Sequence, residues 1–170
     1  MAERKYPEWM GKMRALTDEE IAEFLEEPIV ARLGTVMADG TPYVSPVWQE
    51  YDPEEKVLYI VGREKSAYVK HLQRIPRVSV SCARDNAPYT RALFIGEAEI
   101  VEGPVTAEEG TWQPIADRMA LRYLGERGPE YLEPTLDRPR YLIKVTPNRV
   151  ISWEGVEWAD RYLEIEEEES

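Results

Sequence analysis

The sequence predicts an α+β protein built on a small antiparallel β-barrel with short flanking helices. Segments rich in β-branched and aliphatic residues recur at short intervals, and three apolar patterns at helical spacing lie among them. Antiparallel strands joined by short turns favour a small barrel over an open sheet. The 170-residue chain has the length of one compact domain.

Six strands are predicted from residue type and alternation. Asp39-Gly40, between the first two, is a strong signal for a two-residue hairpin turn. Gly96 interrupts a long alternating segment and predicts a bulge or a tight bend. The predicted strands are residues 29–38, 43–51, 57–61, 78–83, 89–102, and a last one seen as 141–145 and 150–153 on either side of Pro147-Asn148.

Three helices are predicted between the strands. Thr17 and Glu20 have the spacing of a capping box, which places a helix start at Thr17. Ser66 is the candidate N-cap of the second helix, and Gly125 is the candidate C-cap of the third, which follows another capping box at Thr106 to Glu109. The helices lie between Thr17 and Pro28, over residues 66–75 and over residues 112–124, and residues 126–139 are predicted to form a loop.

The chain is expected to contain one folded domain over residues 17–155, preceded by a flexible arm (1–16) and followed by an acidic tail (156–170). No run of apolar residues is long enough to span a bilayer, and the first residues lack the apolar stretch of a secretory signal, so a cytoplasmic location is expected. Cys82 is the only cysteine and His71 the only histidine, which excludes an internal disulfide and a multi-histidine metal site within one chain.

Charge separates one short segment from the rest of the chain. The 33 acidic and 21 basic residues give a net charge of −12, which disfavours nucleic acid and anionic membranes as partners. The segment from Gly62 to Arg84 reverses this balance, with one acidic residue against six basic ones: Arg63, Lys65, Lys70, Arg74, Arg77 and Arg84.

The basic segment begins at the junction between a predicted strand and a predicted helix. A helix N-terminus offers free backbone N–H groups, and Arg63, Lys65 and Lys70 add full positive charges beside it. This combination suits one phosphorylated ligand. The alternative is a solvated basic face, or a set of partners for the abundant glutamates.

A second candidate site is the segment Ser45-Pro46-Val47-Trp48. Proline cannot donate to a β-ladder, so Pro46 implies a sheet edge, a bulge or a split in the sheet. Backbone groups freed there can meet the polar edge of a planar ligand, with Trp48 stacking nearby. The alternative, which this segment alone favours, is an ordinary edge strand with Trp48 in the core. Core packing likewise explains most of the later aromatic residues, and His71 is more simply a structural histidine than a haem ligand.

In their order and spacing, several motifs resemble the pyridoxamine 5′-phosphate oxidase-like split-barrel superfamily, in its branch of FMN- and F420-dependent proteins. The resemblance covers about residues 17–155. The motifs that carry it are Ala31-Arg32-Leu33-Gly34-Thr35, Asp39-Gly40-Thr41-Pro42, Ser45-Pro46-Val47-Trp48, Gly62-Arg63-Glu64-Lys65-Ser66, His71-Leu72, Pro76-Arg77-Val78-Ser79-Val80 and Gly96-Glu97-Ala98-Glu99-Ile100.

The resemblance implies a six-stranded antiparallel split barrel that forms a homodimer, with flavin-type cofactors at the subunit interface. It implies that the cofactor phosphate meets the strand-to-helix junction and that the ring lies along the second and third strands, with a further contribution from the partner subunit. The implied phosphate contacts are Arg63, Lys65, Ser66 and Lys70, the ring contacts are Ser45, Pro46, Val47, Trp48, Ile60 and Val61, and the partner contributes Trp112, with Tyr89 and Arg91 as further candidates.

The function expected from this resemblance is an FMN-binding oxidoreductase, in which the cofactor transfers a hydride or electrons to an unknown small molecule. Family members often have lysine where Tyr68 stands and asparagine where His71 stands, and Lys70 is the candidate substitute for that lysine. The alternatives are an F420-dependent reductase and a non-catalytic protein that holds FMN or haem. FMN is preferred over F420. The long anionic tail of F420 favours an extended basic groove, whereas this chain is very acidic outside one short basic segment.

Overall fold

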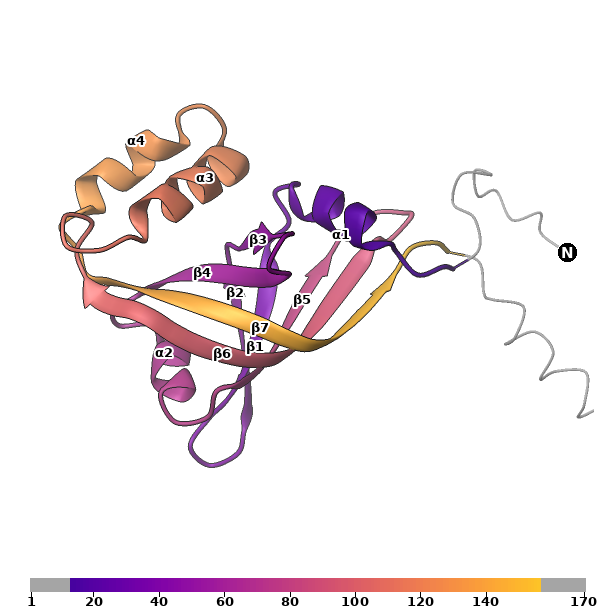
Figure 1. Cartoon of the computed structure of the whole chain (residues 1–170), viewed down its shortest axis with the longest axis horizontal. Helices are drawn as coiled ribbons and strands as arrows, with labels where there is room; N and C mark the ends of the chain where they lie inside the picture. The colour runs from indigo at the N-terminus through magenta and orange to yellow at the C-terminus, as the bar shows by residue number, and fades with distance from the viewer. Residues whose placement is uncertain (1–12, 157–170) are drawn as a thin grey trace, which may run out of the picture.

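The computed structural model describes residues 13–156, which form one strongly curved antiparallel sheet with short helices around it (Figure 1). The seven strands are hydrogen-bonded in the order β2-β1-β5-β6-β7-β4-β3. Their bounds are β1 (Ala31–Val36), β2 (Pro42–Val47), β3 (Glu50–Asp52), β4 (Val57–Arg63), β5 (Arg77–Ala83), β6 (Arg91–Val105) and β7 (Arg140–Trp153).

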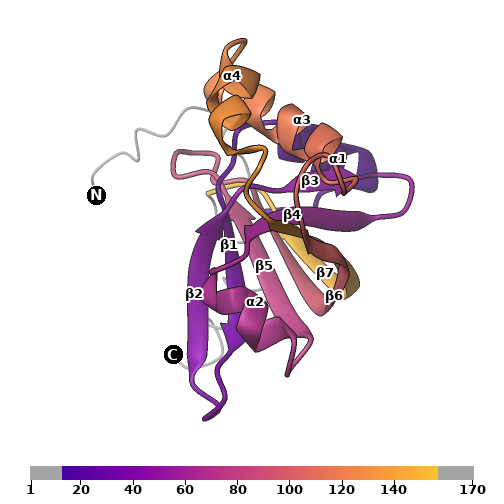
Figure 2. The same cartoon turned by 90° about the vertical axis from the view of Figure 1, so that its left-hand side faces the viewer.

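The two edge strands of this sheet, β2 and β3, follow one another directly in the chain. Only Trp48 and Gln49 join them, and two residues span less than about 12 Å. The sheet must therefore curl until its two edges come together, and Figure 2 shows this curved sheet. The result is a barrel with an open seam between β2 and β3, where Trp48 lies. The α+β antiparallel barrel predicted from the sequence is confirmed.

The number of strands differs from the prediction. Residues 43–51 were expected to form one strand, but the chain passes from one sheet edge to the other at Trp48, so β2 and β3 are separate. Pro46 lies in β2, the edge strand, where its missing N–H leaves no ladder bond unmade. The prediction that Pro46 marks an edge or a split is confirmed.

The longest strands, β6 and β7, pair along their whole length. Their register shifts between Ile95 and Gly96, which confirms the predicted bulge. Pro147 lies opposite Gly96, so the irregular ladder accommodates a residue that cannot donate. For this reason β7 continues without a break through Pro147, where an interruption of the last strand was expected.

Four α-helices and a 3₁₀ turn are present within residues 13–156: α1 (Asp18–Leu25), α2 (Ala67–Leu72), α3 (Gln113–Leu124), α4 (Gly128–Leu132) and η2 (Glu133–Thr135). Thr17 and Glu20 form both hydrogen bonds of the expected capping box. Ser66 makes no side-chain capping bond to α2. None of these helices is long and apolar enough to cross a bilayer.

The segment between β6 and β7 forms a helical layer at one end of the barrel, at the opposite end from α2 (Figures 1 and 2). The second capping box bonds within itself, and α3 begins further on, where the Glu102 carboxylate accepts hydrogen bonds from the N–H groups of Thr111 and Trp112. The expected loop at 126–139 instead contains α4 and η2. Both begin with a proline in their first turn, a position where proline favours a helix.

Apolar side chains form two cores. The larger fills the barrel and includes Leu33, Phe94 and Ile143, all fully buried. The smaller lies between the helical layer and β7 and includes Trp112, Ala120 and Leu142. The helical layer thus has a core of its own.

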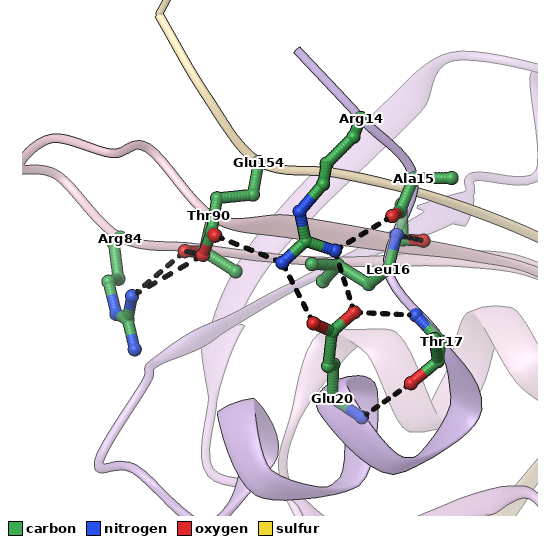
Figure 3. Close-up of polar contacts among 9 residues, drawn as sticks. Arg14, Ala15, Leu16, Thr17, Glu20, Arg84, Thr90 and Glu154 are labelled. Atoms are coloured by element: carbon green, nitrogen blue, oxygen red, sulfur yellow. Dashed lines mark hydrogen bonds and ion pairs between the residues drawn. The ribbon is translucent and has the colours of Figure 1, made fainter. Parts of the chain in front are cut away.

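A polar cluster joins the two ends of the described chain (Figure 3). The Arg14 guanidinium donates to both carboxylate oxygens of Glu20 at 2.8 Å, and the backbone groups of Arg14 and Glu154 form two hydrogen bonds of 2.9 Å. Thr90 donates to Glu154 at 2.7 Å and accepts from Arg84 at 2.8 Å. Residues 1–12 of the expected arm and 157–170 of the expected tail lie outside the described residues.

Candidate functional site

A cavity of about 970 Å³ follows the seam of the barrel from the β4–α2 turn to the helical layer. Its walls come from three places: β2 with the end of β4, the turn into α2, and the segment from α3 to the start of β7. The lining residues are Val30, Ser45, Pro46, Val47, Trp48, Val61, Arg63, Glu64, Lys65, Ser66, Tyr68, Ala116, Met119, Tyr131, Leu132, Thr135, Arg138, Pro139 and Arg140.

Eight of the eleven residues predicted to bind a cofactor line this one cavity: Ser45, Pro46, Val47, Trp48, Val61, Arg63, Lys65 and Ser66. The structure therefore brings together two segments that the sequence only suggested separately. Their role toward a cofactor stays a prediction.

The other three predicted residues do not line the cavity. Ile60 alternates with Val61 on β4 and points into the barrel core, where it is fully buried. Lys70 is an exposed residue of α2 beyond the part of that helix that faces the cavity. Trp112 is fully buried beneath the guanidinium of Arg140, 5.1 Å from its ring centre, so it cannot reach a ligand in this arrangement.

The basic end of the cavity is not neutralised by the protein's own carboxylates. Within residues 13–156, neither Arg63 nor Lys65 has a carboxylate oxygen within 4 Å. Arg84, from the same basic segment, does pair with Glu27. The interpretation of the basic segment as glutamate partners therefore holds for Arg84 and fails for the two cations of the cavity.

Two further cations of this end, Arg138 and Arg140, were missed by the sequence reasoning. They flank Pro139: Arg138 lies in the stretch expected to be a loop, and Arg140 is the first residue of β7. In the β4–β7 ladder Arg140 lies directly opposite Arg63. The only sequence signal was the Arg138-Pro139-Arg140 triplet itself, and nothing along the chain indicated that β7 pairs with β4.

The Arg140 guanidinium is held but incompletely bonded. Its Nη2 donates to the Thr135 hydroxyl at 2.7 Å, whereas its Nε is buried and has no hydrogen-bond partner among the described residues. Burial lowers the pKa of Arg140, and the positive charges of Arg63 and Arg138 lower it further. An anion bound beside Arg140 would therefore stabilise the charged form of its guanidinium.

The other end of the cavity is aromatic. The Trp48 ring stacks on Tyr123, and its centre lies 6.3 Å from that of Tyr131, which is tilted by 52° and 55% exposed. The Tyr123 hydroxyl donates to the carbonyl of Ile29 at 2.7 Å. Burial raises the pKa of Tyr123 to about 12, so this hydroxyl stays a donor at neutral pH.

A buried ion pair fixes the helical layer against the seam. Glu50, 8% exposed, accepts a hydrogen bond from Arg118 Nε at 2.6 Å and forms an ion pair with Arg122, with 2.8 Å between Oε2 and Nη2. Arg122 also donates to the carbonyl of Gln49 at 3.0 Å. These contacts tie α3 to Gln49 and Glu50, next to Trp48 of the cavity lining.

The lining offers binding rather than acid–base chemistry. It contains four cationic side chains and a single carboxylate, Glu64, and it contains neither histidine nor cysteine. His71 lies apart, with Nδ1 2.9 Å from the Thr35 hydroxyl, as expected for a structural histidine. Cys82 is buried in the barrel core. A cavity that is basic at one end and aromatic at the other suits a planar ligand with an anionic group.

Comparisons with known proteins agree with this architecture. The family model described as pyridoxamine 5′-phosphate oxidase matches residues 17–154. The chain belongs to the pyridoxamine 5′-phosphate oxidase family. The resemblance inferred from the motifs is thus confirmed, over nearly the same residues. No curated protein matches the chain.

Three similar solved structures share the fold. A conserved hypothetical protein of Mycobacterium tuberculosis, Rv2991, is 25% identical, with a TM-score of 0.66 over 82% of this chain and 85% of its own. A protein described as an F420 reductase is 26% identical, with a TM-score of 0.60 and coverage of 76% and 94%. The haem storage protein HutZ of Vibrio cholerae is 23% identical, with a TM-score of 0.59 and coverage of 82% and 96%.

Proposed function

We propose that this family member is an oxidoreductase that works with a flavin-type cofactor, FMN in the first place, acting on a small molecule. In this proposal Arg63, Lys65 and Ser66 hold the cofactor phosphate, and the ring lies along Ser45 to Trp48 and Val61. The observation that carries it is one cavity lined both by Arg63 and Lys65, which have no carboxylate oxygen within 4 Å among residues 13–156, and by Trp48, which stacks on Tyr123.

The residues present fit such a group. The cavity volume is at the upper end of the range of about 300–1,000 Å³ for small-molecule sites, so a cofactor and a substrate can share it. A phosphate would neutralise Arg63 and Lys65, which have no carboxylate partner within residues 13–156. The exposed N–H and C=O groups of the edge strand β2 can meet the polar rim of a ring.

When bound, FMN would supply the hydride or electron transfer itself. The chain's residues anchor the anionic end, align the ring through β2 and β4, and exclude water with the wall formed by Met119, Tyr131 and Leu132. No general acid or base is needed from the protein, which agrees with a lining that lacks histidine and cysteine.

F420 is the second candidate cofactor. Arg138 and Arg140 extend the basic end beyond what one phosphate requires, and an extended basic surface is what the tail of F420 would need. The 26% identity with an F420 reductase supports the same alternative. Haem is less well supported, because His71 contacts Thr35 and does not line the cavity, and the likeness to HutZ extends to the fold alone.

A homodimer in the cytoplasm is part of the proposal. The edge strand β2 and the residue before β1 expose apolar side chains next to the cavity, with Val44 at 65% and Val30 at 41% exposure. A second copy covering them would close the seam from outside. A mass measurement in solution tests this, and a monomer at micromolar concentration would contradict it. The single cysteine agrees with a reducing compartment.

The visible spectrum of the purified protein, followed by titration with FMN and F420, tests the cofactor. Flavin bands or saturable FMN binding support the proposal, a Soret band would move the assignment to haem, and a colourless protein that binds neither FMN nor F420 would contradict it. Anaerobic reduction by NADH, NADPH or reduced F420, with a panel of acceptors, separates an enzyme from a carrier.

The phosphate assignment has its own test. Arg63→Ala combined with Lys65→Ala should weaken FMN binding by a few kcal/mol, because each hydrogen bond to a charged group contributes roughly 1.5–3 kcal/mol. Arg149→Ala is the matched control, since Arg149 is exposed on β7 and does not line the cavity. An unchanged FMN affinity in the double variant would remove the assignment.

A further inference from the structure

Two arginines face each other across neighbouring strands at the basic end of the cavity. Arg63 ends β4 and Arg140 begins β7, and they are register partners in the β4–β7 ladder. Like charges placed directly opposite in an antiparallel pair destabilise the sheet. Neither side chain has a carboxylate within 4 Å in residues 13–156, so the described protein does not compensate this repulsion itself.

The contacts of Arg140 orient its guanidinium for binding a ligand as well as stabilising the fold. The guanidinium is positioned from one side by the Trp112 ring and from another by the Thr135 hydroxyl. Thr135 and the exposed Arg138 also line the cavity, so three neighbouring polar side chains of the η2–β7 segment reach the same space. Such a preorganised cluster is typical of phosphate and carboxylate recognition by arginine.

The charges of the cavity exceed what a single phosphate balances. Four cations and one carboxylate give the lining a formal charge of +3. A phosphate monoester carries at most about −2 at neutral pH, which leaves roughly one positive charge over. That remainder lies on the η2–β7 side, across the β4–β7 ladder from the β4–α2 turn to which the first phosphate is assigned.

We infer that Arg138, Arg140 and Thr135 form, with Arg63, a second anion-binding position, so that the cavity takes two anionic groups. The second group is a phosphate, phosphodiester or carboxylate. It belongs either to an extended cofactor tail or to an anionic substrate bound beside the cofactor. The inference deepens the proposed function and rests on it only in assigning the first phosphate to the β4–α2 turn.

The test measures binding of inorganic phosphate and pyrophosphate by calorimetry, without any ring compound. The wild type should bind pyrophosphate at least about tenfold more tightly than phosphate. Arg138→Gln and Arg140→Gln should each weaken pyrophosphate binding by about tenfold or more, because a charge-assisted hydrogen bond is lost. Both should change phosphate binding less than threefold, because Arg63 and Lys65 remain.

Arg149→Gln is the matched control and should behave as the wild type, since this exposed arginine of β7 does not line the cavity. Arg138 is exposed, so its variant keeps the test decisive if Arg140→Gln, which loses the contact with Trp112, fails to fold. An equal ratio of pyrophosphate to phosphate affinity in wild type, Arg138→Gln and Arg140→Gln would overturn the inference. So would the absence of binding to the wild type.

Repeating the titration with FMN-saturated protein identifies the source of the second group. Pyrophosphate binding that persists beside FMN assigns the position to an anionic substrate. Mutual exclusion, together with F420 binding that Arg138→Gln weakens at least tenfold, assigns it to the cofactor. Pyrophosphate binding without any FMN or F420 binding would contradict the proposed function and leave the second anion position supported.

Discussion

The indole ring of Trp48 and the phenol ring of Tyr123 are stacked, with centres 5.0 Å apart and planes within 4° of parallel. Trp48 belongs to the link between the two edges of the sheet, and Tyr123 to α3 of the helical layer. One aromatic contact therefore joins the seam of the barrel to the layer that covers the cavity.

Removing first the hydroxyl and then the ring of Tyr123 should show how much the hydrogen bond and the stack each contribute to the free energy of unfolding. Tyr123→Phe keeps the stack but loses the 2.7 Å bond to the Ile29 carbonyl, which should cost about 1 kcal/mol of unfolding free energy. Tyr123→Leu should cost roughly a further 1 kcal/mol from the lost ring contact. Urea unfolding measures both, with the exposed Tyr131→Phe as a neutral control. Equal effects of the two Tyr123 variants would show that the stack is not stabilising.

The ion pair between Glu50 and Arg122 should be far more sensitive than any surface pair. Both side chains are about nine-tenths buried, so Glu50→Ala would leave the buried Arg122 charge with the exposed Glu26 as its one carboxylate partner among residues 13–156. We expect a loss of about 3 kcal/mol in unfolding free energy. Arg127→Ala, which breaks the exposed pair with Glu130, should change it by less than about 0.5 kcal/mol. Similar losses of unfolding free energy in the two variants would show that the Glu50–Arg122 pair stabilises the fold no more than an exposed pair does.

Gly96→Ala should destabilise the barrel, because a methyl group at this position would lie 2.2 Å from the Thr146 carbonyl oxygen and 2.7 Å from Pro147 Cα. Both obstacles are backbone atoms, so the β6–β7 pair itself would have to move, at a cost of about 1–3 kcal/mol or more. Gly40→Ala, in an open turn, meets no atom within 4 Å and should lose only about 1 kcal/mol, through its positive φ. Thermal unfolding compares the two. A Gly96 variant as stable as the wild type would mean that the bulge can widen freely.

The raised pKa values of Cys82 and Tyr123 predict that the folded protein loses stability in alkali. Burial raises the pKa of each to about 12, above the ordinary values of 9.0 and 10.0. Their contribution is therefore complete below about pH 9 and is lost as the pH rises toward 12, because only the unfolded chain ionises freely there. Unfolding free energies between pH 7 and 11 should fall above pH 9, and less steeply in Cys82→Ala. At pH 8 the native thiol should not react with a disulfide reagent, and rapid labelling would contradict its burial.

Local chemistry made much of the fold predictable from the sequence. Thr17 and Glu20 act within a few residues, and the structure confirms their capping box. A turn does form at Asp39-Gly40, but it is longer than the expected two residues, because Ala38, Asp39 and Gly40 all lie between the hydrogen-bonded Met37 and Thr41. Gly96 and Pro46 were read correctly because an irregular ladder or a sheet edge is the natural place for such residues in a strand.

The features that the sequence missed depend on contacts between distant segments. The break at Trp48 is set by the meeting of two sheet edges, and the exclusion of Trp112 from the cavity is set by a second core. Arg140 became a site residue only because β7 pairs with β4, about eighty residues earlier in the chain. Side-chain periodicity carries no information on which strands become neighbours, so of these two facing arginines only Arg63 could be identified in advance.

The pairing of Arg14 with Glu154 brings the entry and the exit of the domain to a single point on its surface. A short glycine-rich linker could therefore connect residues 14 and 154 and make the domain circular in sequence. New ends could then be opened at the exposed Asp39-Gly40 turn, whose residues do not line the cavity. Such a permuted chain would keep every strand contact in place and would offer its new ends, at this turn, for fusion to other proteins.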